Sequence, residues 1–319
     1  MRTRCLGAAD TLGRWFLLPT RKRQIVGWIA VGLSIAITCL WASWGIVENF
    51  HEGWYDESWL SNVGLMFAQY LSPMILFLAV SLVSIFWPRA GAGLHGVLAL
   101  GLAWFFGALS NTVVLLLLLP LLGLGALYWY GRPQPRKLAA SLAIGLPLLT
   151  LVIAGAEPAL RVSQRLDDGN VQARLVQGNG VDLIWAPAGP GWPRQGADWD
   201  EARQVCEHLS GDGLTLAPVP QHIWRLPAVE EAVRSMARHG QNSGGVWDGA
   251  SARAAYEIKP DKESPLWDVH SQVIYWWTAT EAGGDRAYII VYDGQVWPRS
   301  KQFGPDYLGF RCVKPPPND

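Results

Sequence analysis

The feature that most constrains this chain is a series of apolar stretches in its first half, each about as long as a lipid bilayer is thick. A hydrocarbon core about 30 Å thick needs roughly 20 apolar residues in a helix. Five stretches meet this length, at residues 25–47, 63–87, 91–109, 112–130 and 138–156. The sequence therefore predicts an integral membrane protein, with a basic leader over residues 1–24 and a five-helix transmembrane domain over residues 25–156.

The short segments between these stretches indicate an orientation, because Lys and Arg concentrate in cytoplasmic loops. The leader is basic, and basic residues also follow the second stretch, at Arg89, and the fourth, at Arg132, Arg136 and Lys137. Residues 48–57 carry acidic side chains and no Lys or Arg. We expect a cytoplasmic N-terminus and, after five crossings, a C-terminal half outside the cytoplasm, in the periplasm or at the cell surface.

The five stretches contain no Asp, Glu, Lys or Arg. Transporters and proton relays place such residues within the bilayer. We therefore interpret the helices as an anchor whose partner is the lipid bilayer. The half beyond residue 160 is mildly acidic, with 16 Lys and Arg against 20 Asp and Glu. This balance argues against nucleic acid as a partner, since phosphates require a basic surface.

The second half predicts a globular α+β domain over residues 171–319, after a linker at 157–170. Strands are expected at 171–176 and 181–187 around Gln177-Gly178-Asn179-Gly180, and later at 273–278, 287–292, 295–299 and 308–313. Asp293-Gly294 predicts a tight hairpin between two of the later strands.

Two helices are expected before the later strands. The first begins after an N-cap at Asp198 and runs to about Leu209, with one buried face: Trp199, Ala202, Val205, Cys206 and Leu209. The second begins with Pro227 at its first position and ends before Gly240. Its predicted buried residues are Val229, Val233 and Met236.

Four motifs in this half occur in a specific order: Trp199-x-x-Ala202-x-x-x-Cys206, Trp224-Arg225-Leu226-Pro227, Tyr275-Trp276-Trp277-Thr278-Ala279-Thr280 and Gly309-Phe310-Arg311-Cys312-Val313. In this order, residues 181–315 resemble the C-type-lectin-like superfamily. They are most similar to the bacterial Lcl C-terminal-like domain and the related formylglycine-generating (sulfatase-modifying) enzymes. The resemblance implies a C-type-lectin-like fold and a disulfide between Cys206 and Cys312. It also implies structural roles for Trp199, Trp224, Arg225, Pro227, Trp276 and Arg311.

The resemblance does not extend to catalysis. Formylglycine-generating enzymes use a pair of cysteines that bind copper, and no cysteine of this half remains once Cys206 and Cys312 are paired. We therefore expect no enzyme activity, no catalytic residues and no cofactor. Calcium is conceivable at Asp261, Glu263 and Asp268, which we interpret instead as a solvated acidic loop.

Tryptophan is abundant, with 18 residues, and aromatic and Arg side chains dominate binding surfaces. Our candidates for a ligand surface are Trp247, Trp267, Trp297, Arg299 and Tyr307, although Trp267 also fits a core position. The sequence thus favours a membrane-anchored extracytoplasmic module that binds a protein or glycan at the cell envelope. The alternatives are a structural subunit of a membrane complex, which docks through the same domain, and an enzyme of unrecognised type.

Overall fold

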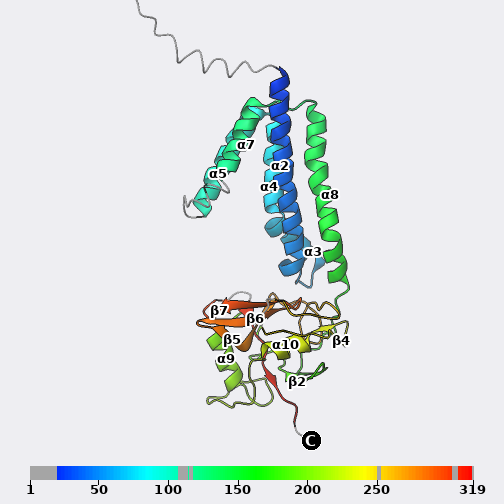
Figure 1. Cartoon of the computed structure of the whole chain (residues 1–319), viewed down its shortest axis with the longest axis vertical. Helices are drawn as coiled ribbons and strands as arrows, with labels where there is room; N and C mark the ends of the chain where they lie inside the picture. The colour runs from blue at the N-terminus through cyan, green and yellow to red at the C-terminus, as the bar shows by residue number, and fades with distance from the viewer. Residues whose placement is uncertain (1–19, 107–113, 115–117, 250–252, 304–307, 318–319) are drawn as a thin grey trace, which may run out of the picture. The chain divides into compact units, whose positions relative to one another are not determined.

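The computed structural model describes residues 20–106, 114, 118–249, 253–303 and 308–317. The chain divides into two compact units, and Figure 1 shows the elements of each. A helical unit comprises Met1–His51 and Leu60–Ala159, and an α+β unit comprises Glu52–Trp59 and Leu160–Asp319.

The first half of the chain is mainly helical in its described part. The elements are α2 (Thr20–Glu48), η1 (Asn49–Gly53), α3 (Trp59–Leu65), η2 (Met66–Tyr70), α4 (Ser72–Phe86), α5 (Pro88–Phe105), α7 (Leu119–Tyr130) and α8 (Arg136–Ser163). The segments η1 and η2 are single π-helical turns that continue or join α-helices.

Among the described residues, two helices are long and apolar enough to cross a membrane, Thr20–Gly53 and α8. The pair Trp59–Tyr70 and Ser72–Phe86 would provide a third crossing, but it bends by 58° between its two parts. Apolar helix α7 has only 12 residues, and residues 112–113 and 115–117 of the expected stretch at 112–130 lie outside the described residues. A membrane-spanning first half is therefore supported, while five crossings remain a prediction.

Helix α8 continues beyond its expected end at residue 156. Its 28 residues extend about 42 Å at 1.5 Å per residue, more than a hydrocarbon core requires. The first half of the expected linker is consequently helical, and the segment that precedes strand β1 starts only after Ser163.

Small side chains allow the helices of the helical unit to pack closely. Its core includes Ala30 and Val31 of α2, Ile85 of α4, Tyr128 of α7, and Ala139 and Ala143 of α8. The Tyr128 hydroxyl lies 3.0 Å from the Ser34 hydroxyl across this core. Such packing is typical of membrane helices, where small residues let the backbones approach.

The second half forms an α+β unit, as expected. Its strands are β1 (Arg174–Gly178), β2 (Val181–Trp185), β3 (Ala237–Arg238), β4 (Gln241–Asn242), β5 (Tyr275–Gly283), β6 (Arg286–Val291), β7 (Val296–Ser300), β8 (Leu308–Gly309) and β9 (Val313–Lys314). Its helices are α9 (Trp199–His208) and α10 (Val229–Ser235). The described strands form sheets with the orders β1-β2-β9, β3-β4 and β7-β6-β5-β8.

Local signals place the first hairpin and the first helix correctly. Strands β1 and β2 pair with Gly178 opposite Val181, so Asn179 and Gly180 form a two-residue turn with φ of 50° and 78°. Positive φ at both positions is what an Asn-Gly hairpin turn requires. Helix α9 begins after Asp198, whose carboxylate accepts a hydrogen bond of 2.8 Å from the Glu201 N–H. Its expected apolar face packs into the core.

The second helix is shorter than expected. Helix α10 begins at Val229, so Pro227 lies before the N-cap residue Ala228 rather than at the first helical position. The helix ends at Ser235 because the chain turns at Met236 into the β3–β4 hairpin, around His239 and Gly240 at positive φ. The predicted buried residues Val229, Val233 and Met236 are all at most 1 % exposed.

The expected last strand at 308–313 is wrong as one element. Strand β8 pairs in parallel with β5, whereas β9 pairs with β2 in a different sheet. The chain leaves one sheet for the other between them, through the buried residues Phe310, Arg311 and Cys312.

The sheet β7-β6-β5-β8 is covered on both faces. Successive strand residues point to opposite faces. Accordingly, Trp276 and Ile290 belong to one core cluster, while their neighbours Trp277 and Ile289 belong to the other. Strand β7 is one of the two edges of this sheet.

Candidate functional site

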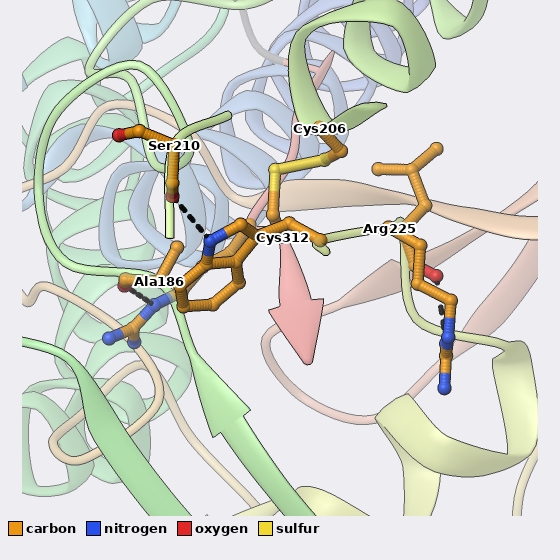
Figure 2. Close-up of a disulfide and its surroundings, with 8 residues drawn as sticks. Ala186, Cys206, Ser210, Arg225 and Cys312 are labelled. Carbon is orange, nitrogen blue, oxygen red and sulfur yellow. Dashed lines mark hydrogen bonds between the residues drawn. A yellow bond between two sulfur atoms is a disulfide. The ribbon is translucent and has the colours of Figure 1, made fainter. Parts of the chain in front are cut away.

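The disulfide implied by the resemblance is present, since Cys206 of α9 and Cys312 are bonded with their Cα atoms 5.6 Å apart. In the view of Figure 2, Ser210 and Ala186 lie to one side of this bond and Arg225 to the other. The Trp224 indole N–H donates to the Ser210 carbonyl at 2.8 Å. Both cysteines are fully buried, so the bond joins α9 to the segment between β8 and β9 inside the core.

The other motif residues are committed to internal contacts. Arg225 holds both carboxylate oxygens of Glu231, at 2.6 and 2.7 Å, and the same carboxylate accepts the Ala228 N–H at the start of α10. The Trp199 indole N–H donates to the Thr278 carbonyl at 2.8 Å. These contacts are structural, since they join the side chains of Arg225, Glu231 and Trp199 to neighbouring parts of the fold.

Arg311 is a fully buried guanidinium that binds backbone carbonyls. Its Nε donates to Ala186 at 2.8 Å and its Nη1 donates to Leu266 at 2.6 Å and to Pro265 at 3.1 Å. The guanidinium carbon lies 3.6 Å from the centre of the Trp192 ring. Burial lowers the pKa of this side chain below its usual value. Arg311 thus connects β2, the loop before β5 and the C-terminal segment.

The five candidate binding residues do not form one surface. Trp267 is 2 % exposed and stacks on Trp276 with ring centres 3.7 Å apart, so it belongs to the core rather than to a ligand surface. Trp247 is half-buried and packs edge-on against Tyr288 of β6 at 5.2 Å. Tyr307 lies outside the described residues.

The remaining two candidates, Trp297 and Arg299, lie together on the edge strand β7. Tyr288 is paired with Pro298, so its side chain and that of Pro298 share one face of the sheet, while Trp297 and Arg299 point to the other. The structure therefore separates Trp247 from Trp297 and Arg299 across the sheet.

Arg299 is flanked by two aromatic rings. Its guanidinium carbon lies 5.7 Å from the Trp297 ring centre and 5.8 Å from that of Phe303. Trp297 is 42 % exposed and Phe303 is 47 % exposed, so the three residues form a surface patch. We refer to Trp297, Arg299 and Phe303 as the aromatic–arginine patch. Phe303 was absent from the sequence-based candidates, because it follows the strand and only its contact with Arg299 connects it to the patch.

A cavity of about 310 Å³ opens beside this patch. It is lined by Arg299 and Phe303 together with Tyr275, Leu308 and Glu52. The lining combines a cation, a carboxylate and aromatic side chains.

The α+β unit has two larger cavities, of about 410 and 450 Å³. The first lies among Arg253, Tyr256, Lys259, Asp293 and Gln295. The second lies among polar residues of segments 55–57, 194–195 and 268–272. Neither lining includes a residue of the aromatic–arginine patch, whereas the 310 Å³ cavity is lined by Arg299 and Phe303, so we take the patch and this cavity as the candidate for ligand binding.

Sequence reasoning missed a buried ionic cluster. Asp261 is 1 % exposed, and its carboxylate lies 2.7 Å from Arg238 Nη1, 3.0 Å from Arg165 Nη2 and 3.7 Å from Arg161 Nε. Burial by itself raises the pKa of Asp261, but Arg165, the Lys262 N–H and Arg161 outweigh it, so the pKa lies below its usual value. The expectation of a solvated acidic loop is wrong here, because the acids neutralise arginines that are distant in sequence.

Two neighbours of Asp261 are buried as well. Glu263 accepts the N–H groups of Leu166, at 2.9 Å, and of His239. The Lys262 ammonium donates to the Ser271 carbonyl. Burial, reinforced by the charge of Arg165, lowers the Lys262 pKa to about 7. This cluster fixes the loop that precedes β5 to the segment that follows α8.

Within the described residues, no group of three His, Cys, Asp or Glu side chains is placed to hold a metal ion. Comparison with known proteins adds no identification: no family model matches the chain, and no curated protein and no solved structure matches it. The lectin-like resemblance accordingly rests on the four sequence motifs alone.

Proposed function

We propose that this chain is a membrane-anchored binding module, which recognises a protein or glycan ligand at the cell envelope through the aromatic–arginine patch. The observation that carries the proposal is the exposure of Trp297 and Phe303 around Arg299 on an edge strand, beside a cavity. Most other large aromatic side chains of the unit are buried. Exposed Trp and Arg side chains in such a cluster are typical of binding hot spots.

The proposal places the α+β unit outside the cytoplasm. Two features support this side of the membrane: the basic residues of the N-terminal leader and the Cys206–Cys312 bond. Disulfides persist in oxidising compartments and are rare in the cytosol. Two apolar helices of membrane-spanning length, one directly before the unit, provide the anchor.

A capture experiment with the full-length protein tests this function. The protein is cross-linked in native membranes, purified through a tag and compared with the double variant Trp297→Ala/Phe303→Ala. The matched control is Leu216→Ala, which removes an exposed apolar side chain elsewhere in the same unit. A ligand that is retained by the wild type and by Leu216→Ala, but lost from the double variant, supports the proposal. Equal retention by all three proteins rules out the patch as the binding surface.

The structural-subunit alternative gives a different result in this experiment. If the chain were a permanent subunit, its partner protein would co-purify with it at a fixed ratio without cross-linking. Loss of that partner would then destabilise the α+β unit. A recognition module would keep its folding stability when the ligand is absent.

A further inference from the structure

The guanidinium of Arg299 lies over two aromatic rings. Trp297 and Phe303 lie on either side in sequence, and each ring centre is within 6 Å of the guanidinium carbon. A guanidinium can contact aromatic rings and also bind a carboxylate, because its N–H groups form a planar fork that matches the two carboxylate oxygens. In the part of the chain that the structure describes, Arg299 forms no salt bridge, whereas Arg165, Arg225 and Arg238 all do.

The backbone of β7 is poorly suited to bind an extended peptide. The bonds from Val291 N–H to Gln295 and from Lys301 N–H to Asp285 show that every second residue of β7 pairs with β6. Pro298 lies between these pairs, so its nitrogen and carbonyl face the open edge. Proline has no N–H to donate, and the Pro298 carbonyl already accepts from Arg286 Nη2 at 3.2 Å. Strand addition is therefore blocked at the centre of this edge.

The cavity offers groups for a hydroxylated ligand as well as for a charge. Its lining places the Glu52 carboxylate and Tyr275 in the same space as Arg299. A carboxylate accepts hydrogen bonds from hydroxyl groups and repels a bare anion. The exposed Trp297 and Phe303 rings provide apolar faces for C–H groups. A cation, an acceptor and aromatic faces together match a ring that carries both hydroxyls and one carboxylate.

We propose that the ligand of the aromatic–arginine patch is an acidic sugar residue, whose carboxylate binds the edge of Arg299 and whose ring lies against Trp297. This inference rests on the proposed binding function and narrows its ligand to uronic-acid-type glycans. The sugar hydroxyls donate to Glu52 within the cavity.

The test uses full-length protein in nanodiscs of zwitterionic lipid. Binding of galacturonate and glucuronate oligomers is measured by titration calorimetry and compared with the methyl esters of the same oligomers. We expect the free acids to bind at least tenfold more tightly than the esters. Arg299→Met removes this preference, and Arg299→Lys weakens acid binding at least tenfold because an ammonium lacks the planar fork. Trp297→Leu weakens binding of acid and ester alike.

The matched control is Arg203→Met. Arg203 also lies over a tryptophan, 5.0 Å from the Trp199 ring centre, but it pairs with Glu207. This variant loses the same charge and the same kind of contact, so it should bind the acids like the wild type. Retention of the native thermal transition in each variant shows that binding, rather than folding, is altered.

Three outcomes overturn the inference. One is equal binding of acids and esters, or no binding of either oligomer. Another is an equal loss in Arg203→Met and Arg299→Met, which would indicate non-specific charge attraction. The third is preferential binding of polyglutamate over both sugars, which would indicate an acidic peptide ligand. If the captured native ligand depends on Trp297 but not on Arg299, the proposed function stands and only the acidic-sugar inference fails.

Discussion

Replacing Asp261 with Asn should destabilise the α+β unit by about 3–5 kcal/mol, because it leaves buried arginines without their counter-ion. Asn preserves the shape of the side chain and removes only the charge. The Asp261 side chain is fully inaccessible, and those of Arg165 and Arg238 are 5 % and 9 % exposed. Water can therefore screen little of the loss, and Glu263 would be the remaining acid within reach of Arg238.

The free energy of unfolding can be measured by pulse proteolysis in urea, with the full-length protein in detergent and a C-terminal tag to follow the unit. Glu281→Gln is the matched control, since it breaks the Lys301 pair, in which the Glu281 side chain is 54 % exposed. Surface pairs of this kind contribute about 0–1 kcal/mol. If Asp261→Asn costs no more than Glu281→Gln, the charge of Asp261 does not stabilise the fold. Adding Arg238→Met to Asp261→Asn should recover part of the loss.

Acid should reproduce the effect of the Asp261→Asn substitution in the wild type. The Asp261 pKa is lowered in the folded state, so its stabilisation is complete above its unfolded pKa of about 4 and is lost as pH falls through the folded value. The stability difference between wild type and Asp261→Asn should therefore shrink below about pH 4. A difference that stays constant into acid would show that charge is not its origin.

Three further predictions concern single features of the α+β unit. In the wild type, the free energy of unfolding should rise between pH 7 and 10, because the folded Lys262 pKa of about 7 lies below the unfolded value. Lys262→Met should raise the free energy of unfolding at pH 7 and remove most of this rise, and urea unfolding across this pH range measures both effects. Replacing Cys206 and Cys312 with Ala should cost up to about 5 kcal/mol, since the bond closes a loop of 106 residues; the difference should vanish when the wild type is reduced before unfolding. Gly180→Ala should cost about 1–2 kcal/mol, because Gly180 has φ of 78°, whereas an unchanged thermal transition would contradict the turn assignment.

Features set by neighbouring residues could be predicted from the sequence. The Asn179-Gly180 turn and the Asp198 cap of α9 each depend on a few adjacent residues, and each forms where expected. The hairpin at Asp293-Gly294 also forms, but Val291 pairs with Gln295, so its loop has three residues, 292–294, rather than two. The Cys206–Cys312 bond joins distant residues and was inferred only through the four motifs.

Features set by distant contacts could not be predicted. Residues 308–313 have the composition of one strand, but Arg311 binds the carbonyls of Ala186 and Leu266 and draws the chain from one sheet to another. Asp261 and Glu263 have the composition of a solvated loop, and nothing nearby in the sequence reveals that Arg161 and Arg165 at the end of α8 would meet them. Both errors arise because charged side chains in this unit bind partners that are distant in the sequence.

The tryptophans show why a binding surface is harder to predict than a core. Trp267 and Trp297 are the same residue type in segments of similar composition, yet one is stacked on Trp276 and the other is 42 % exposed. The difference comes from strand order: β5 lies inside its sheet with both faces covered, so the adjacent Trp276 and Trp277 are both buried, whereas β7 is an edge. Packing in the core therefore does not fix the position of Trp297 as it fixes that of Trp267. Pro298 keeps that edge from pairing with another strand, so strand addition does not account for the exposed rings beside Arg299, and the proposed ligand recognition is the hypothesis to test there.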